Sequence, residues 1–151
     1  MTDIASVVLW HRRARPKPDH DALNVQLGCH FEEIAEMLVA LKAENAVTVD
    51  KLSQARFLMM KLADGFKMGL LEAYIEDEVE FLDSLCDQIV TAAGVGYCAG
   101  MDVEGGVTEV NSSNWSKFDD NGQPLRDSNG KIKKGPRYRK PELGGFVRGG
   151  V

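Results

Sequence analysis

Apolar residues recur every three to four positions over two long stretches of this chain, and that period is the signature of amphipathic helices. Between about residues 21 and 43 the stripe consists of Leu27, Phe31, Ile34, Leu38 and Leu41. Between about residues 71 and 99 it consists of Ile75, Val79, Leu82, Cys86 and Ile89. Because each stripe covers one side of its helix, we expect both stripes to be buried. The sequence therefore predicts an all-α fold.

Weaker signals complete a four- to five-helix bundle. A short first helix precedes two prolines, and a third helix begins after Val47, with Thr48 or Asp50 as its N-cap. Gly100 ends the fourth helix, and a fifth covers about residues 107–118. Two turn-forming runs beyond Phe118 flank a possible hairpin. We therefore expect a helical domain over residues 1–118 and, over 119–151, an irregular, turn-rich and basic C-terminal extension of that same domain.

Charge and cysteine usage narrow the class of protein. Its 18 basic and 23 acidic residues give a formal charge of −5, which argues against a stable nucleic-acid partner held by phosphate neutralisation. The apolar run from Ile4 to Trp10 is too short to span a bilayer and precedes its basic residues, the reverse of a signal peptide. Three scattered cysteines without a Cys-x-x-Cys pair are typical of reduced core thiols. We expect a cytoplasmic protein without membrane contact, in the host cytoplasm if a phage encodes it.

Paired carboxylates are the strongest chemical signal. Glu33 and Glu36 lie at i and i+3 of the second predicted helix, and Glu80 and Asp83 repeat that spacing on the fourth. If the two helices pack antiparallel, four carboxylates converge, and their repulsion requires divalent cations. Oxygen ligands favour Mg²⁺, with Mn²⁺ as the alternative, and a second cation can bind beside Asp87.

Other interpretations of these acids remain open. A single Glu-x-x-Glu pair is more often a solvated helix face, and Glu32 is the acid that we expect to be plain surface. A di-iron carboxylate bundle also uses paired acids, but it needs Glu-x-x-His, and no histidine here has a glutamate three positions before it. A non-catalytic bundle that binds nucleotides or other proteins stays open on the residues alone.

A second polar group lies toward the C-terminus. Asn111, Asn114 and Lys117 fall at i, i+3 and i+6, a spacing that suits phosphate and sugar oxygens. Asparagines also weaken and end helices, and the residues alone leave both interpretations open. The basic tail that carries Lys134 and Tyr138 can close over a triphosphate or serve as a solubilising end; its prolines make it stiff, which favours closure.

The residues resemble a family once the motifs are joined. The pattern EExxE followed by ExxD is present as EEIAE at 32–36 and EFLD at 80–83. Three further strings follow: LDSLCDQIVTAAGVGYCAGMD, EVNSSNWSKF and GKIKKGPRYRKPEL. Together they resemble the MazG-like all-α NTP pyrophosphohydrolases, which include phosphoribosyl-ATP pyrophosphohydrolase, over about residues 7–143. The interval between the two acidic motifs is longer than in MazG itself, which implies a longer second or third helix.

The resemblance implies an enzyme that hydrolyses a nucleoside triphosphate to its monophosphate and pyrophosphate. Water attacks between the α and β phosphates, and Glu33, Glu36, Glu80 and Asp83 bind Mg²⁺. The resemblance also implies a homodimer or a dimer of dimers. The apolar residues of 46–68 independently favour association, because they exceed what one helix face can bury.

Overall fold

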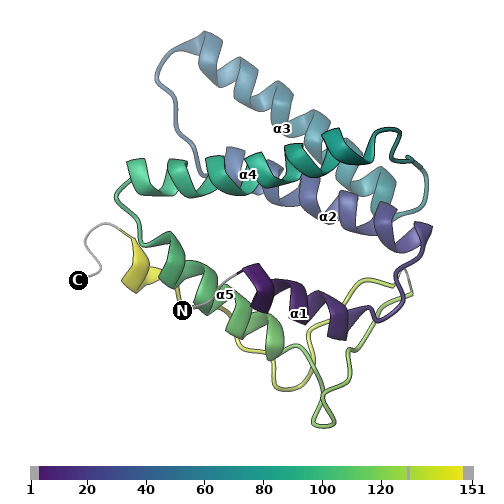
Figure 1. The fold of residues 1–151 in the computed structure, drawn as a ribbon. Helices are drawn as coiled ribbons and strands as arrows, with labels where there is room; N and C mark the ends of the chain where they lie inside the picture. Colours follow the sequence, from purple (N-terminus) through teal and green to yellow (C-terminus); the bar gives the residue numbers. More distant parts are fainter. Residues whose placement is uncertain (1–3, 129, 148–151) are drawn as a thin grey trace. The chain divides into compact units, whose positions relative to one another are not determined.

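The computed structural model describes residues 4–128 and 130–147, and this part of the chain holds five α-helices and no β-strand. The elements are α1 (Ile4–Ala14), α2 (His20–Val39), α3 (Ala46–Lys67), α4 (Glu78–Cys98), α5 (Val103–Trp115) and a 3-10 turn, η1 (Gly144–Phe146) (Figure 1). The all-α prediction is confirmed. The chain forms two compact units.

The first unit comprises described residues 18–74, 128 and 130–131 and is a hairpin of α2 and α3. Small residues allow these helices to approach closely. A Cβ at Gly28 would lie 2.8 Å from the carbonyl oxygen of Ala63 and 2.8 Å from Cγ of Lys67. Larger residues would therefore force the two helices apart.

The predicted stripe of α2 is half-buried along its length except at its end. Phe31 packs on Phe66 of α3, with ring centroids 6.0 Å apart. Leu41 is 54% exposed because the helix ends at Val39, earlier than predicted. The predicted N-cap of α3 was also wrong: the side chain of Asn45, not of Thr48 or Asp50, accepts the backbone N–H of Thr48 at 2.8 Å.

The fourth helix begins seven residues later than the predicted Leu71. Gly69 has φ +68°, a left-handed conformation that ends α3. The side chain of Asn24 then accepts the backbone N–H of Ala73 at 2.9 Å, which holds this connection extended along α2. Asp77 caps α4 by accepting the N–H groups of residues 79 and 80, both at 3.0 Å. These side-chain contacts override the helical periodicity of residues 71–77.

The second unit comprises described residues 4–17, 75–127 and 132–147, and its core lies between α1 and the segment after α5. Trp10, Ala14 and Phe118 are buried together, and Ile132 packs against them. The rings of Trp10 and Phe118 stack with centroids 5.9 Å apart. This core fixes the end of α5 and the start of the C-terminal tail.

The predicted buried stripe of α4 is wrong for the structure as described. No residue of α4 is buried, and Val79, Leu82 and Ile89 are 80%, 62% and 52% exposed. Within its own unit α4 contacts α5 alone among the described helices, near the turn at Gly100, where φ is +72°. A short contact at one end cannot cover a 21-residue helix.

The region after α5 contains the predicted turns but only a rudimentary hairpin. Asp119 accepts the backbone N–H groups of residues 121 and 123, and Gly122 takes a positive φ of 68°. Two isolated antiparallel bridges follow, between Phe118 and Pro124 and between Arg126 and Ile132.

Two further expectations concern membranes and thiols. Among the described helices none is both long and apolar enough to cross a membrane. The cysteines are free, but Cys86 and Cys98 are exposed and only Cys29 is partly buried. The prediction of core thiols is therefore wrong for two of the three, both of which lie on the exposed α4.

Candidate functional site

The predicted metal ligands lie on two helices of different units. Glu33 and Glu36 are exposed on α2, and Glu80, Asp83 and Asp87 are exposed on α4. Within residues 4–128 and 130–147, no three His, Cys, Asp or Glu side chains lie together as a metal-binding group. The convergence of the two carboxylate pairs therefore stays a prediction.

Four of these carboxylates are among the many acids of the described chain, Glu78 included, that form no ion pair. Over the described residues, Glu36, Glu80, Asp83 and Asp87 form no ion pair. Acids elsewhere do have partners: Glu72 accepts from His20 at 2.8 Å and from the Tyr74 hydroxyl at 2.9 Å. These four carboxylates therefore have no ion-pair partner in the described chain that an external cation would have to displace.

Glu32 does not behave as the plain surface residue that we expected. Its carboxylate accepts hydrogen bonds from Lys67 at 2.8 Å and from Lys131 at 3.2 Å, and its side chain is only 24% exposed. Burial raises the pKa of Glu32, but the hydrogen bonds from the two lysines outweigh that effect, and the pKa lies below its usual range. Glu32 therefore ties α3 and residue 131 to α2, a structural role beside the predicted ligand Glu33.

The two asparagines of α5 have different partners: Asn111 contacts α1, and Asn114 contacts Lys117. Asn111 is 8% exposed, and its Nδ2 donates to Ser6 Oγ of α1 at 3.0 Å. Asn114 Oδ1 accepts from Lys117 Nζ at 2.7 Å, and Lys117 also lies over the Trp10 ring, 5.9 Å from its centroid. The structure thus brings Asn114 and Lys117 together and gives Asn111 a part in joining α1 to α5.

The tail segment that carries Lys134 passes against Lys117. A Cβ at Gly135 would lie 2.7 Å from the Lys117 carbonyl oxygen, so only glycine allows this approach. Lys134 Nζ lies 4.8 Å from the centroid of the Tyr138 ring. Both predicted tail residues therefore lie close to the end of α5, in the same unit as Asn114.

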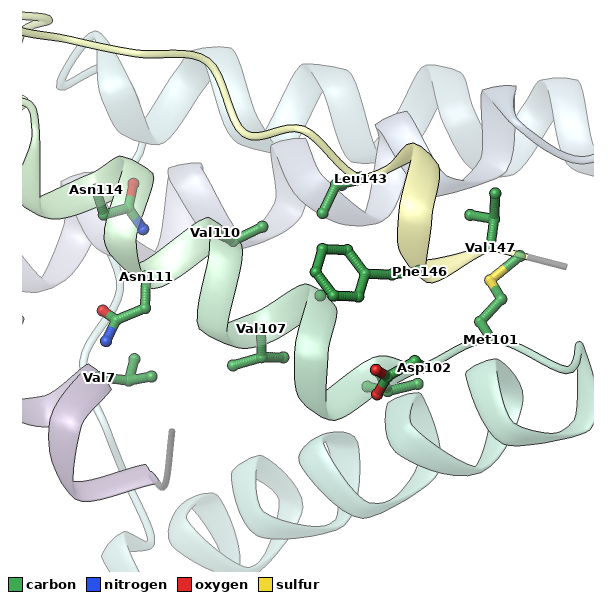
Figure 2. A pocket seen from close by; sticks show the side chains of 12 residues that line it. Val7, Met101, Asp102, Val107, Val110, Asn111, Asn114, Leu143, Phe146 and Val147 are labelled. Atoms are coloured by element: carbon green, nitrogen blue, oxygen red, sulfur yellow. The ribbon is translucent and has the colours of Figure 1, made fainter. Parts of the chain in front are cut away.

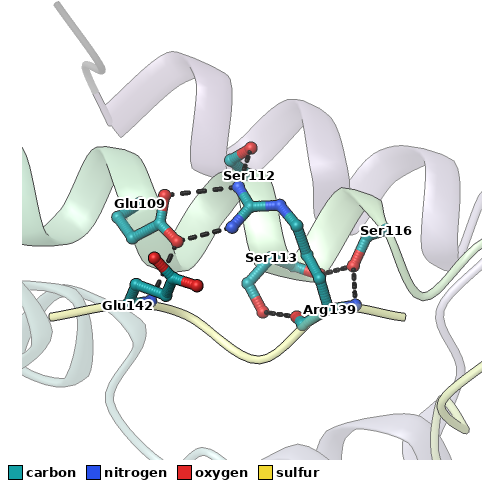
Figure 3. A network of polar contacts seen from close by, with 6 residues as sticks. All are labelled: Glu109, Ser112, Ser113, Ser116, Arg139 and Glu142. Atoms are coloured by element: carbon teal, nitrogen blue, oxygen red, sulfur yellow. Dashed lines mark hydrogen bonds and ion pairs between the residues drawn. The ribbon is translucent and has the colours of Figure 1, made fainter. Parts of the chain in front are cut away.

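A polar clamp, consisting of Glu109, Ser112, Ser113, Ser116 and Arg139, fastens the tail to α5 (Figure 3). Arg139 donates to both oxygens of Glu109, at 2.5 and 3.2 Å. Ser113 is 3% exposed and donates to the Arg139 carbonyl oxygen at 2.8 Å, while Ser116 accepts the Arg139 N–H at 2.9 Å. The Arg139 guanidinium, and then the N–H of Glu142, lower the pKa of Glu109.

Part of the positive charge of the basic tail is neutralised within the chain. Three of the cations of this tail pair with acids of the same chain and need no external anion. Lys131 pairs with Glu32, Arg137 with Asp120 at 2.9 Å, and Arg139 with Glu109. The tail is fixed before any ligand binds, and Lys134 is one of the cations that forms no ion pair among the described residues.

The clamp was missed at the sequence level although it leaves a pattern. Glu109, Ser112, Ser113 and Ser116 fall at i, i+3, i+4 and i+7, one polar stripe along a helix. Its partner Arg139 is 30 residues away from Glu109, and no local spacing indicates which of the tail cations it selects.

Comparison with known proteins adds no family assignment. No protein-family model, no curated protein and no solved structure matches this chain. The case for a function therefore depends on the residues and the geometry described above.

Proposed function

We propose that this chain is a metal-dependent nucleoside triphosphate pyrophosphohydrolase of the MazG-like class, acting on a ribo- or deoxyribonucleotide. The observation that carries the proposal is the pair of exposed i, i+3 carboxylates on each of α2 and α4. Four of the five predicted ligands have no ion pair in the described chain, so no cation of the chain competes with a metal ion for them. A cation-free cluster of such groups would be repulsive, so the arrangement suits divalent metal.

Carboxylate oxygens alone match the preference of Mg²⁺ or Mn²⁺. Glu33, Glu36, Glu80 and Asp83 would hold the metal, with Asp87 available to a second ion. A bound divalent cation neutralises phosphate oxygens and lowers the pKa of a coordinated water.

The chain's own residues would bind and orient the triphosphate. Lys117 and Lys134 supply positive charge at the end of α5, and Asn114 lies in contact with Lys117. The clamp holds the tail in place before the substrate arrives, so little ordering of the tail opposes binding. No covalent nucleophile is required, because water attacks between the α and β phosphates.

We further propose a homodimer or a dimer of dimers in the cytoplasm. The support is the exposed apolar surface of α3 and α4, which includes Phe57 at 61%, Leu58 at 58% and Val90 at 67% exposure. Sedimentation at micromolar concentration should show a dimer or tetramer, and a monomer would remove this part of the proposal.

The proposal is tested by pyrophosphate release from a panel of ribo- and deoxyribonucleoside triphosphates with Mg²⁺. Glu36→Gln and Asp83→Asn should lower turnover by orders of magnitude while circular dichroism remains helical. Glu78→Gln is the matched control, because this exposed residue of α4 lies outside the predicted ligand set. Unchanged turnover in both ligand variants would refute the site. A nucleotide that binds without hydrolysis would instead indicate a non-catalytic nucleotide-binding bundle.

A further inference from the structure

A pocket of about 350 Å³ lies within the α4–α5 unit, between α1, α5 and the chain around η1. Its walls are mainly aliphatic and aromatic: Val107 and Val110 of α5 line it together with Leu143 and Phe146 of the chain around η1 (Figure 2). This volume is at the lower end of the range of small-molecule sites, roughly 300–1,000 Å³. It is large enough for a sugar and a base.

The polar side chains are not scattered over the pocket. Figure 2 shows Asn111 and Asn114 together at one end, while Met101 and Asp102 lie at the other. Asp102 is already engaged as the N-cap of α5, where it accepts the N–H of Gly105 at 2.9 Å. Asn111 already donates to Ser6 Oγ, so the NH₂ group of Asn114 is the donor that can give a ligand its orientation.

The amide end of the pocket leads to positive charge. Because an ammonium group can only donate, the contact with Lys117 assigns the oxygen of Asn114 to that side and leaves its NH₂ as a donor. Lys117 is next to the tail segment that carries Lys134. Along the pocket, the lining therefore changes from amide side chains, next to the lysines, to apolar side chains.

Gly106 keeps the pocket open. A Cβ at this position would face Leu143, with no atom of that side chain closer than 4.0 Å, so the space in front of Gly106 is empty. The neighbouring Gly105 differs, because a Cβ there would lie 2.6 Å from the Phe146 ring. A side chain at 106 can therefore extend into the pocket without disturbing its walls.

We propose that this pocket binds the nucleoside half of the substrate, with the base between the valines and Phe146, the sugar at the two amides and the triphosphate outside at the lysines. The inference rests on the proposed function and assigns one part of the substrate to one place. A multiply charged triphosphate cannot enter apolar walls without a large desolvation cost, whereas a base and sugar bury favourably there. The order of lysine, amide and apolar wall matches the order of phosphate, sugar and base.

The test is a pair of substitutions at Gly106 in the full-length protein. Gly106→Leu fills the pocket, whereas Gly106→Ala adds one methyl group and controls for the change in helix propensity. We expect the KM for the best nucleotide to rise about tenfold or more in Gly106→Leu and about twofold at most in Gly106→Ala. Inorganic tripolyphosphate, which lacks a nucleoside, should inhibit the wild type and both variants equally. Val110→Phe narrows the pocket from the same helix and should give the same KM effect if Gly106→Leu fails to fold.

Failure of the proposed function and failure of the pocket assignment give different results in these experiments. A wild-type protein that neither hydrolyses nor binds any nucleotide overturns the proposed function and the pocket assignment together. If Gly106→Leu hydrolyses the nucleotide with an unchanged KM, the pocket assignment alone is wrong. It is also wrong if Gly106→Leu loses inhibition by tripolyphosphate to the same extent as it loses affinity for the nucleotide. A filled variant that changes its oligomeric state at constant KM would show that a second copy of the chain occupies the pocket.

Discussion

Glu32 and Glu36 lie one turn apart on α2, and the same substitution at each should have opposite consequences. Glu32→Gln removes the charge from a carboxylate that is bound by Lys67 and Lys131 and only 24% exposed. Glu36→Gln removes the charge from an exposed carboxylate that forms no ion pair among the described residues. Comparison of the two separates structural acids from predicted metal ligands.

The magnitude for Glu32→Gln follows from these contacts. A hydrogen bond to a charged group contributes about 1.5–3 kcal/mol when buried, and far less when one partner is exposed. Lys67 is 17% exposed and Lys131 is 44% exposed, so the Lys67 contact dominates. Since glutamine still accepts one hydrogen bond, we expect a loss of about 1–2 kcal/mol in the free energy of unfolding, or a Tm lower by roughly 3–6 °C.

Glu36→Gln should leave stability unchanged within about 0.5 kcal/mol while it abolishes Mg²⁺-dependent turnover. The pH dependence gives a second signature. Because the pKa of Glu32 is lowered in the folded chain, its stabilising effect is complete above the usual pKa of 4.5 and is lost as the pH falls through the folded value. The stability difference between wild type and Glu32→Gln should therefore vanish in acid. Thermal melts from pH 3 to 7, with turnover assays, provide both readouts. A destabilised Glu36→Gln with a neutral Glu32→Gln would refute the reasoning.

Three further predictions concern the tail and the pocket. Glu109→Gln should loosen the clamp and expose the tail to proteolysis at neutral pH; in the wild type the same loosening should appear only below the lowered pKa of Glu109, and equal cleavage of both proteins at pH 7 would contradict this. Lys134→Ala should raise KM about fivefold without changing kcat, an effect that shrinks at high salt, and an unchanged KM would remove Lys134 from the substrate site. If the sugar lies at the two amides, Asn114→Leu removes the NH₂ group that donates to the sugar at nearly constant side-chain size, so kcat/KM should fall about tenfold. An unchanged kcat/KM in Asn114→Leu would contradict the placement of the sugar.

Periodicity was a sound guide to the existence of helices and a poor guide to their ends and burial. The stripe of α2 predicts its packing because a partner, α3, follows within the same unit. The stripe of α4 has the same period, yet Leu82 is 62% exposed, because periodicity indicates which side of a helix is apolar and not what covers it. The predicted start of α4 was wrong because the side chain of Asn24 accepts the backbone N–H of Ala73, which keeps the residues before α4 out of the helix.

The candidate site was predictable where it depends on local spacing. The carboxylate pairs lie three positions apart on a helix, and Lys117 lies three positions after Asn114, just beyond the end of α5. Pairings between distant residues did not follow, because each tail cation has several acids to choose from. Glu32 and Arg139 are two cases in which only the folded chain identifies the partner.

Phosphorus NMR of the products distinguishes metal-dependent cleavage between the α and β phosphates from cleavage between the β and γ phosphates. With Mg²⁺ and the best nucleotide, we expect nucleoside monophosphate and pyrophosphate in equal amounts, and no reaction when the metal is chelated. Release of inorganic phosphate with a nucleoside diphosphate, or equal turnover in the presence of a chelator, would contradict the proposed function.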